Sequence, residues 1–257
     1  MSELERGQSR RLGMAVQNRS LERGIAVLRA FRPGVDLLGN SELAERTGLP
    51  RATISRLTQT LTSVGMLDYC RSARAYRLAA PVLSLAHAMR SASPVLKISY
   101  PSMRALSQEL GVNVGLAAVD QYDMVYLESI RHSQQRSLRS IVAGQRVPIA
   151  LTTLGRAYLA ALPQEQRAEL YAYFASHLGH WDTLRGEIEQ AIEHVHEYGF
   201  CQASWQPGIV ALATPLVLPE HQVYALNIST NRNLSDQRWI GRLAKQLLKL
   251  RAHIKSL

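Results

Sequence analysis

One face of a predicted helix over residues 51–64 carries short polar side chains and arginine, a combination that is suited to contacting nucleic acid. Its other face is an apolar stripe of Ile54, Leu57, Leu61 and Val64. Short donors and acceptors can approach base edges closely, and arginine binds phosphates and guanine. The candidate contacts on the polar face are Arg51, Ala52, Thr53, Ser55, Arg56, Thr58 and Gln59.

Two shorter predicted helices and a glycine-containing turn would hold this face outward. The first runs over 19–30 with Ser20 as its N-cap, and the second over 41–46 with Ser41 as its N-cap and Gly48 as a left-handed stop. The turn "TGLP" then leads into the polar-faced helix. Two helices joined by such a turn are typical of a helix-turn-helix, whose second helix enters the major groove.

A predicted hairpin follows these helices and adds a basic tip. Residues 67–69 and 76–78 alternate as two short strands, with Arg71 and Arg74 between them. A hairpin in this place makes the module a winged helix-turn-helix, and we expect the tip arginines to lie along phosphates or a minor groove. The alternative is a three-helix packing module whose polar face is simply solvated.

Net charge is concentrated at the same end of the chain. The 257 residues carry a formal charge of +10, and residues 1–78 hold 13 arginines, no lysine and 7 carboxylates, so that 13 minus 7 places +6 there. A basic segment attracts polyanions, although a solvated basic surface without a partner has the same composition. Charge therefore supports a nucleic-acid partner without deciding it.

A second stretch with chemical potential is "ALTTLGRAYL", in which Thr152 and Thr153 stand at a predicted helix start. Unpaired N–H groups and hydroxyls at the positive end of a helix dipole suit a carboxylate, while plain N-capping explains the same residues. The surrounding pattern predicts one antiparallel sheet flanked by helices, hence an α+β fold. Its predicted helices cover 95–110, 152–161, 164–176, 182–198 and residues from Ser235 on, and its extended segments 112–120, 123–130, 137–150, 200–204, 209–218 and 222–230.

Other function classes find little support. The pairs His177/His180 and His194/His196 lack further ligands at zinc spacing, and no phosphate loop, nucleophile elbow or dinucleotide fingerprint occurs, so we expect neither an enzyme nor a bound metal or cofactor. Absence of a long apolar run and of a secretion signal indicates a cytoplasmic protein. Cys70 and Cys201, the only cysteines, are expected to be reduced thiols.

The order of several segments resembles the isocitrate lyase regulator (IclR) family of bacterial transcription regulators. These segments are "SLERGIAVLRAF", "SELAERTGLPRATISRLTQTL", "YRLAA", "GQRVPIALTTLGRAYLAALP" and "GIVALATPLV" with "YALNIST". The resemblance implies a winged helix-turn-helix over 18–79, a linker helix over 80–93 and a GAF-like effector-binding domain over 94–257. It also implies a homodimer or tetramer on palindromic operator DNA, with a small organic acid as effector.

Effector residues follow from the resemblance by position in the motifs. In the family, the carboxylate end of the effector lies at this helix start, opposite a short polar pair on the last strand and residues on the two strands before it. By position in the motifs, the resemblance suggests as effector residues here Thr153, Leu154, Cys201, Ala211, Asn227 and Ser229. An acidic residue typical of members that bind the smallest acids is missing, and Trp205 could line a wider pocket, although tryptophan is more often a packing residue. We therefore expect an aromatic or other small organic acid as effector of a catabolic regulator. The alternative is a metabolite-binding protein or enzyme whose winged helix docks on another protein.

Overall fold

The computed structural model describes most of the chain and divides it into two compact units. The described residues are 18–132, 142–203, 209–218, 223–230 and 237–257. The division falls inside one helix, after His87, and each unit is described separately below. Within the described residues, no helix has the length and apolar character needed to cross a membrane.

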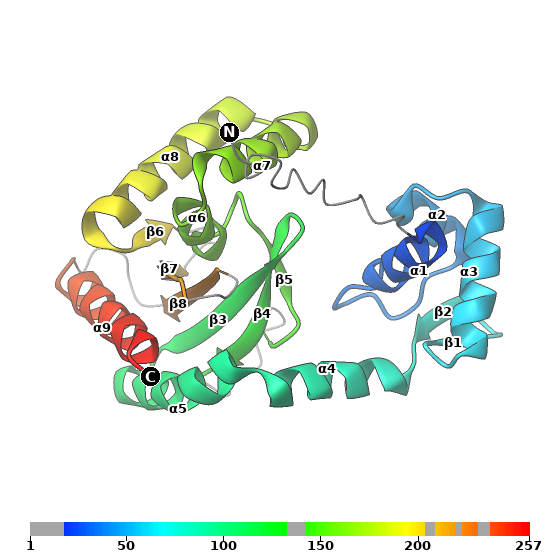
Figure 1. Cartoon of the computed structure of the whole chain (residues 1–257), viewed down its shortest axis with the longest axis horizontal. Helices are drawn as coiled ribbons and strands as arrows, with labels where there is room; N and C mark the ends of the chain where they lie inside the picture. Colours follow the sequence, from blue (N-terminus) through cyan, green and yellow to red (C-terminus); the bar gives the residue numbers. More distant parts are fainter. Residues whose placement is uncertain (1–17, 133–141, 204–208, 219–222, 231–236) are drawn as a thin grey trace, which may run out of the picture. The chain divides into compact units, whose positions relative to one another are not determined.

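The N-terminal unit is a three-helix module followed by a two-stranded hairpin (Figure 1). Its elements are α1 (Arg19–Arg29), α2 (Asn40–Thr47), α3 (Arg51–Ser63), β1 (Leu67–Cys70) and β2 (Ala75–Leu78). Val27, Leu43 and Ile54, one from each helix, are fully buried together with Leu67 of the hairpin. This small core fixes the three helices and the hairpin against one another. The predicted winged helix-turn-helix is confirmed.

The structure confirms Gly48 as the left-handed C-cap of α2 but corrects both predicted N-caps of this unit. Asn18, and not Ser20, caps α1, because its side-chain oxygen accepts from the backbone N–H groups of Ser20 and Leu21. Helix α2 begins one residue before Ser41, and the Glu42 carboxylate accepts the N–H of Gly39 at 2.8 Å. In each case a neighbouring polar side chain reaches the exposed first-turn donors better than the predicted serine.

The apolar stripe of α3 also differs from the prediction. Ile54 is buried and Leu57 and Leu61 are half-buried, whereas Val64 is 62% exposed. Thr58, predicted on the polar face, is fully buried and donates its hydroxyl hydrogen to the Ile54 carbonyl at 2.9 Å. A threonine four residues after a buried isoleucine lies on the same helical face, and bonding to its own helix satisfies the hydroxyl.

Helix α4 (Ala80–Ala92) leads toward α5 (Pro94–Leu110), which begins as soon as α4 ends. Ser93 caps α5 by accepting from the Leu96 N–H, and a proline in the first turn needs no hydrogen-bond donor there. No residue of α4 is buried, in contrast to seven residues of α5. The predicted linker segment is therefore helical, and only the helix after it packs into a core.

The C-terminal unit is built on a six-stranded antiparallel sheet in the order β5-β4-β3-β8-β7-β6. Its strands are β3 (Asn113–Asp120), β4 (Asp123–Ile130), β5 (Arg146–Pro148), β6 (Cys201–Ala203), β7 (Val210–Leu216) and β8 (Tyr224–Thr230). Its remaining helices are α6 (Thr153–Ala160), α7 (Gln164–His177), α8 (Trp181–Tyr198) and α9 (Gln237–Lys255). Of the extended segment predicted over 137–150, the described part contains only the short β5. The predicted α+β class is confirmed.

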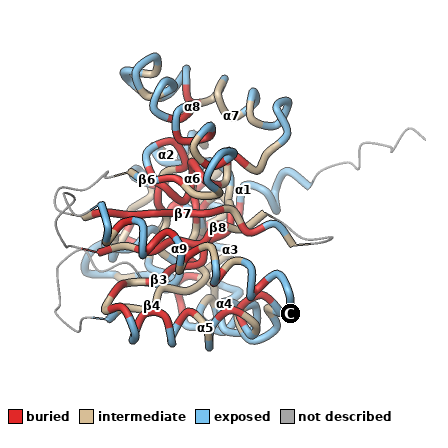
Figure 2. Tube along the Cα trace, turned by 90° about the vertical axis from the view of Figure 1, so that its left-hand side faces the viewer, coloured by how far each residue is buried: buried red, intermediate tan, exposed pale blue. Residues whose placement is uncertain are grey.

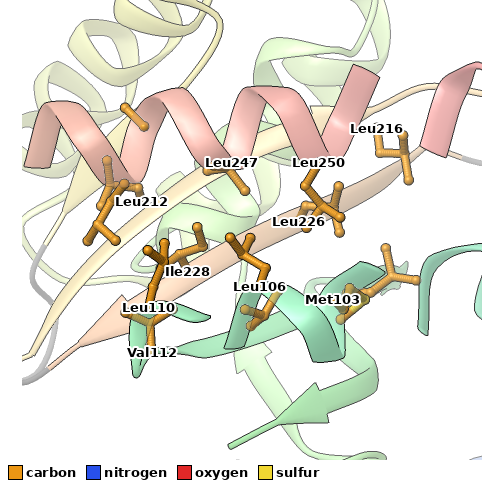
Figure 3. Packing of buried hydrophobic residues seen from close by; sticks show 14 of the residues in the cluster. Met103, Leu106, Leu110, Val112, Leu212, Leu216, Leu226, Ile228, Leu247 and Leu250 are labelled. Atoms are coloured by element: carbon orange, nitrogen blue, oxygen red, sulfur yellow. The ribbon is translucent and has the colours of Figure 1, made fainter. Parts of the chain in front are cut away.

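Helices cover both faces of this sheet, so that its central strands are buried on both sides (Figures 1 and 2). Helices α5 and α9 pack on one face, where Leu106, Leu226 and Leu247 meet in an apolar cluster (Figure 3). Helices α6, α7 and α8 cover the other face, with Leu154 and Ile188 in its core. Alternate residues of each strand therefore belong to different cores, and the second face is the one that α6 meets.

Candidate DNA interface and ligand site

The described part of α3 presents most of the predicted DNA contacts to solvent. Arg51, Ala52, Arg56 and Gln59 are exposed, and Thr53 with Ser55 is half-buried. The predicted residue Thr58 is the exception, since it is buried as described above. Two long cations and short polar groups therefore stand on one accessible face of a helix whose opposite face is held in the core. Such a face has the dimensions and donors to enter a major groove.

A hollow of about 570 Å³ lies beside this face, between α1 and α3. Thr53 and Arg56 line it together with Leu21 and Ile25 of α1, which are 62% and 41% exposed. Both apolar residues fall at helical spacing within α1, yet the structure leaves them on the surface of the unit. Periodicity alone indicates an apolar face and does not tell a core from a hollow.

The wing is a tight turn that carries the predicted arginines. Arg71 and Arg74 are exposed at its tip, and Arg74 has a positive φ of 50°. The hairpin is fastened to the helices by a bridge from Leu38 to Tyr76, with N–O distances of 2.9 Å in both directions. Cys70 lies at the base of the turn, where a 3.2 Å contact with the Ser72 hydroxyl lowers the pKa of its thiol.

At the second predicted site, the start of α6 is fixed by two local features. The Thr152 hydroxyl donates to the Pro148 carbonyl at 2.9 Å and accepts the Gly155 N–H at 3.3 Å, so Thr152 is the N-cap. A Cβ at Gly155 would lie 2.0 Å from the carbonyl oxygen of Ile149. Glycine is therefore required for the helix to approach this backbone closely. The first-turn N–H groups of Thr153 and Leu154 lie at the positive end of the helix.

The predicted ligand residues of the strands lie on the sheet face that α6 covers. One row across the strands holds Cys201, Ala213, Asn227 and Gly115 as successive partners. The Cys201 thiol contacts the Thr153 carbonyl at 3.5 Å, and burial raises the pKa of this thiol to about 12. The start of α6 and the sheet are thus in direct contact.

A neighbouring row at the end of these strands contains the other predicted residues. Ala211 pairs with Ser229, which is half-buried, and these two are flanked by Ala203 and Asn113. Neither Ala203 nor Asn113 was predicted as a ligand residue. Both stand on the correct face because strand residues two apart point the same way, but only the strand register reveals that they adjoin Ser229. The predicted residue Trp205 lies outside the described residues.

A buried polar pair joins the predicted residue Asn227 to Tyr126, which was not predicted. Asn227 donates through its amide nitrogen to the Tyr126 hydroxyl at 3.2 Å, and both side chains are almost fully buried. Burial raises the pKa of Tyr126 to about 12. A Cβ at Gly115 would lie 2.4 Å from the Asn227 side-chain oxygen, so glycine leaves the space that this pair occupies. Asn227 and Ser229 provide neutral hydrogen-bonding groups that can orient a polar ligand.

The described residues contain no group of three or more histidine, cysteine or carboxylate side chains placed to hold a metal ion. The histidines of the pair His194/His196 meet backbone carbonyls. His194 Nδ1 lies 2.7 Å from the Phe200 oxygen, and His196 Nε2 lies 2.9 Å from the Ala160 oxygen. Both cysteines are free thiols, in separate units of the chain.

Comparison with known protein families matches both units of the chain. Residues 20–69 match the IclR helix-turn-helix domain, and residues 87–255 match the C-terminal domain of the bacterial transcriptional regulator IclR. The chain belongs to the IclR family. The two matches cover the helix-turn-helix and the sheet with its flanking helices, which are the parts that the geometry singles out.

Individual relatives agree with membership of the IclR family. The chain is 36% identical to the HTH-type transcriptional regulator TsaQ1/TsaQ2 of Comamonas testosteroni over 70% of this chain and 66% of that protein. It is 29% identical to the Pca regulon regulatory protein of Pseudomonas putida, over 90% and 78% of the two chains. The crystal structure of an IclR family regulator from Brucella abortus superimposes with a TM-score of 0.84 and 30% identity, over 92% and 91% of the chains.

Proposed function

We propose that this IclR family member is a ligand-responsive, DNA-binding regulator of a catabolic operon. The observation that carries the proposal is the exposed α3 face, on which Arg51, Arg56 and Gln59 stand beside short polar residues in a unit that matches the IclR helix-turn-helix domain. In this proposal α3 enters a major groove, and Arg71 and Arg74 of the wing contact phosphates. Two copies of the chain, as a homodimer or within a tetramer, would read a palindromic operator.

The names of two relatives support a role in catabolism of aromatic acids. One is the Pca regulon regulatory protein of Pseudomonas putida. Another, 25% identical over 83% of this chain, is the p-hydroxybenzoate hydroxylase transcriptional activator of Acinetobacter baylyi. For the present chain we propose an aromatic or other small organic acid as effector.

The proposed effector site is the α6 start together with the facing sheet rows. The carboxylate would accept the first-turn N–H groups of Thr153 and Leu154, while Asn227 and Ser229 would orient the rest of the molecule. Ala203 and Ala211 pair on neighbouring strands beside Ser229, and their small side chains suit a ring better than a strongly hydrated acid. No charged side chain is needed in this arrangement.

A path from this site to the linker helix is available within the C-terminal unit. Tyr126, which binds Asn227, is two residues before Glu128 on β4. The Glu128 carboxylate accepts from Arg90 of α4 at 2.6 Å, and Arg90 also donates to the Leu127 carbonyl. We propose that an effector which shifts β4 thereby moves the end of α4. Coupling between two sites typically amounts to about 1 to 3 kcal/mol, enough for a several-fold to hundredfold change in operator affinity.

Selection from a random duplex library with the full-length protein tests the DNA-binding part. The expected result is enrichment of a two-fold symmetric sequence, and its loss with the Arg51→Ala/Arg56→Ala double variant. Enrichment of the same sequence by the double variant would contradict the role of α3.

A thermal-shift titration with 4-hydroxybenzoate and benzoate tests the effector part. A ligand that binds only the native state at 100 times its dissociation constant adds about 2.7 kcal/mol of stability. We expect a rise in midpoint that Ser229→Ala reduces, while Ser256→Ala, an exposed control at the C-terminus, leaves it unchanged. Equal rises in thermal midpoint for wild type, Ser229→Ala and Ser256→Ala would show that the effector does not bind at the proposed site.

A further inference from the structure

A cavity of the C-terminal unit is walled by α6, β6 and α8. It has a volume of about 770 Å³, within the range of pockets that hold small molecules. Arg156 of α6, Gln202 of β6 and several residues of α8 line it. Of the residues that form the proposed effector site, Ala203 alone is among its lining residues.

The most distinctive group in the cavity wall is the guanidinium of Arg156. Its side chain is only 9% exposed, and it donates through Nη2 to the Glu187 carboxylate at 2.6 Å. Its Nε makes a long contact of 3.4 Å with the Ala150 carbonyl, and Nη1 has no partner among the described residues. A buried guanidinium usually has its donors filled, and a planar carboxylate is the group that fits two of them at once.

Glu187 is bound to Arg156 but is not itself enclosed. Its side chain is 54% exposed, so solvent can replace the ion pair when Glu187 rotates away. The glutamates of α8 are typical of a solvated helix face, and this one faces both solvent and the cavity. Glu187 therefore occupies the position that a ligand carboxylate would take.

Several neutral polar residues that are exposed to solvent line the same space. Thr183, Gln190 and Gln202 line the cavity, and none of their side chains has a hydrogen-bond partner among the described residues. His194 contacts the Phe200 carbonyl through Nδ1, which leaves Nε2 as its other polar atom. Leu151, Leu184, Ala191 and Ala203 supply an apolar wall. A pocket that binds an organic acid usually combines an apolar wall with one cation and a few polar groups that can hydrogen-bond the ligand.

We propose that this cavity is a second small-molecule site, which binds an organic carboxylate through Arg156. The ligand carboxylate replaces Glu187 on the guanidinium, its hydrocarbon part lies against Leu151 and Leu184, and polar substituents meet Gln190 or Gln202. Because Arg156 follows Thr153 by one turn of α6, the helix that closes the proposed effector site also forms this one. The proposal does not depend on the assignment of the effector site.

Isothermal titration calorimetry of the full-length protein with benzoate tests the proposal. Benzamide, a neutral molecule of the same shape, is the control ligand. The variants are Arg156→Met, which removes the cation and keeps an unbranched side chain, and Glu187→Gln, which removes the competing carboxylate. We expect Arg156→Met to weaken benzoate binding at least about tenfold and Glu187→Gln to strengthen it several-fold. Benzamide should bind at least about tenfold more weakly than benzoate.

The opposite signs of the two variants separate a binding site from a structural ion pair. If Arg156 and Glu187 only join α6 to α8, both variants lower the thermal midpoint and change benzoate affinity alike, which would overturn the proposal. Benzoate binding that is lost in Ser229→Ala but unchanged in Arg156→Met would assign the ligand to the effector site alone, and would also overturn it. So would the absence of benzoate binding at millimolar concentration in both wild type and Glu187→Gln.

Discussion

The two units place their candidate functional residues in opposite environments. The N-terminal unit carries them on one exposed face of α3 and on the wing, all within 24 consecutive residues from Arg51 to Arg74. The C-terminal unit collects them from α6 and three strands into a buried face, where Asn227 bonds Tyr126 and Cys201 touches Thr153. Substitutions should therefore affect mainly DNA binding in the first unit, and both stability and ligand binding in the second.

The largest predicted effect is that of Gly155→Ala in the second unit. The added methyl group would lie 2.0 Å from the Ile149 carbonyl oxygen, so α6 must move off the backbone beneath it. We expect the free energy of unfolding of the C-terminal unit to fall by about 3 kcal/mol, measured by urea denaturation.

Gly186→Ala is the matched control for that substitution. Gly186 lies inside α8 with open space around its Cβ position. We expect stability to be unchanged or to rise by up to about 1 kcal/mol, because alanine favours a helix. A similar loss in both variants would mean that the close approach at Gly155 is not the cause.

Tyr126→Phe should give the next largest effect. It removes the hydroxyl that accepts the Asn227 amide hydrogen at 3.2 Å and leaves that buried amide without its partner. We expect a loss of about 2 kcal/mol in urea denaturation. Tyr122→Phe, at a residue that is 41% exposed, should change stability by less than about 0.5 kcal/mol. If the two variants behave alike, the buried pair makes no net contribution.

The pH dependence of stability tests the burial of Cys201. Burial raises its pKa to about 12, above the value of about 8.5 of an unfolded thiol. The unfolded chain therefore loses this proton first, and the stability associated with the thiol is present below about pH 8.5 and is lost as pH rises toward 12.

Removal of the thiol should flatten this dependence. Between about pH 9 and pH 11 we expect Cys201→Ala to reduce the decline in unfolding free energy by up to about 1.4 kcal/mol per pH unit, measured from urea midpoints. Cys70→Ala should keep the wild-type decline over this interval. Identical slopes in all three proteins would show that Cys201 ionises equally well in the folded chain.

The smallest effect concerns reactivity and not stability. Cys70 lies on the wing with its pKa lowered by the Ser72 hydroxyl, whereas Cys201 is fully buried. A disulfide reagent at about pH 8 should therefore modify Cys70 rapidly and Cys201 only when the chain unfolds. Ser72→Ala should slow the rapid phase, and mass spectrometry of the modified peptide identifies the residue. Faster modification of Cys201 than of Cys70 would contradict the predicted order of thiol reactivity.

The contrast between the units also explains what the sequence could predict. The exposed face of α3 was predictable because a helix presents one face at fixed spacing, so that Arg51, Arg56 and Gln59 fall together without any tertiary information. Errors there came from positions where tertiary contacts decide burial, such as Thr58 and Leu21. Thr58 follows Ile54 by four residues and Leu21 precedes Ile25 by four, so helical spacing places each beside an apolar residue but does not show whether it is buried.

In the C-terminal unit, the sequence predicted which strand positions share a face but not which ones adjoin. Asn113 and Tyr126 were missed because they lie on strands that are distant in sequence from the predicted residues, and Ala203 because only the register of β6 against β7 shows that it adjoins Ala211. The Arg156 pair was missed for the same reason, since its partner lies 31 residues away on another helix. Long-range pairing is a property of the folded chain that local patterns do not contain.

The central claim is that α3 is the DNA-reading helix. It is tested most directly by the salt dependence of duplex binding, measured for wild type, Arg56→Ala and Arg104→Ala. Arg56 is exposed on α3, and Arg104 is exposed on α5 of the other unit. With the selected duplex, we predict that Arg56→Ala lowers affinity by about 1 to 3 kcal/mol or reduces the salt slope by about one, and that Arg104→Ala changes neither. Equal affinities and equal slopes in all three proteins would contradict the assignment of α3 as the DNA-reading helix.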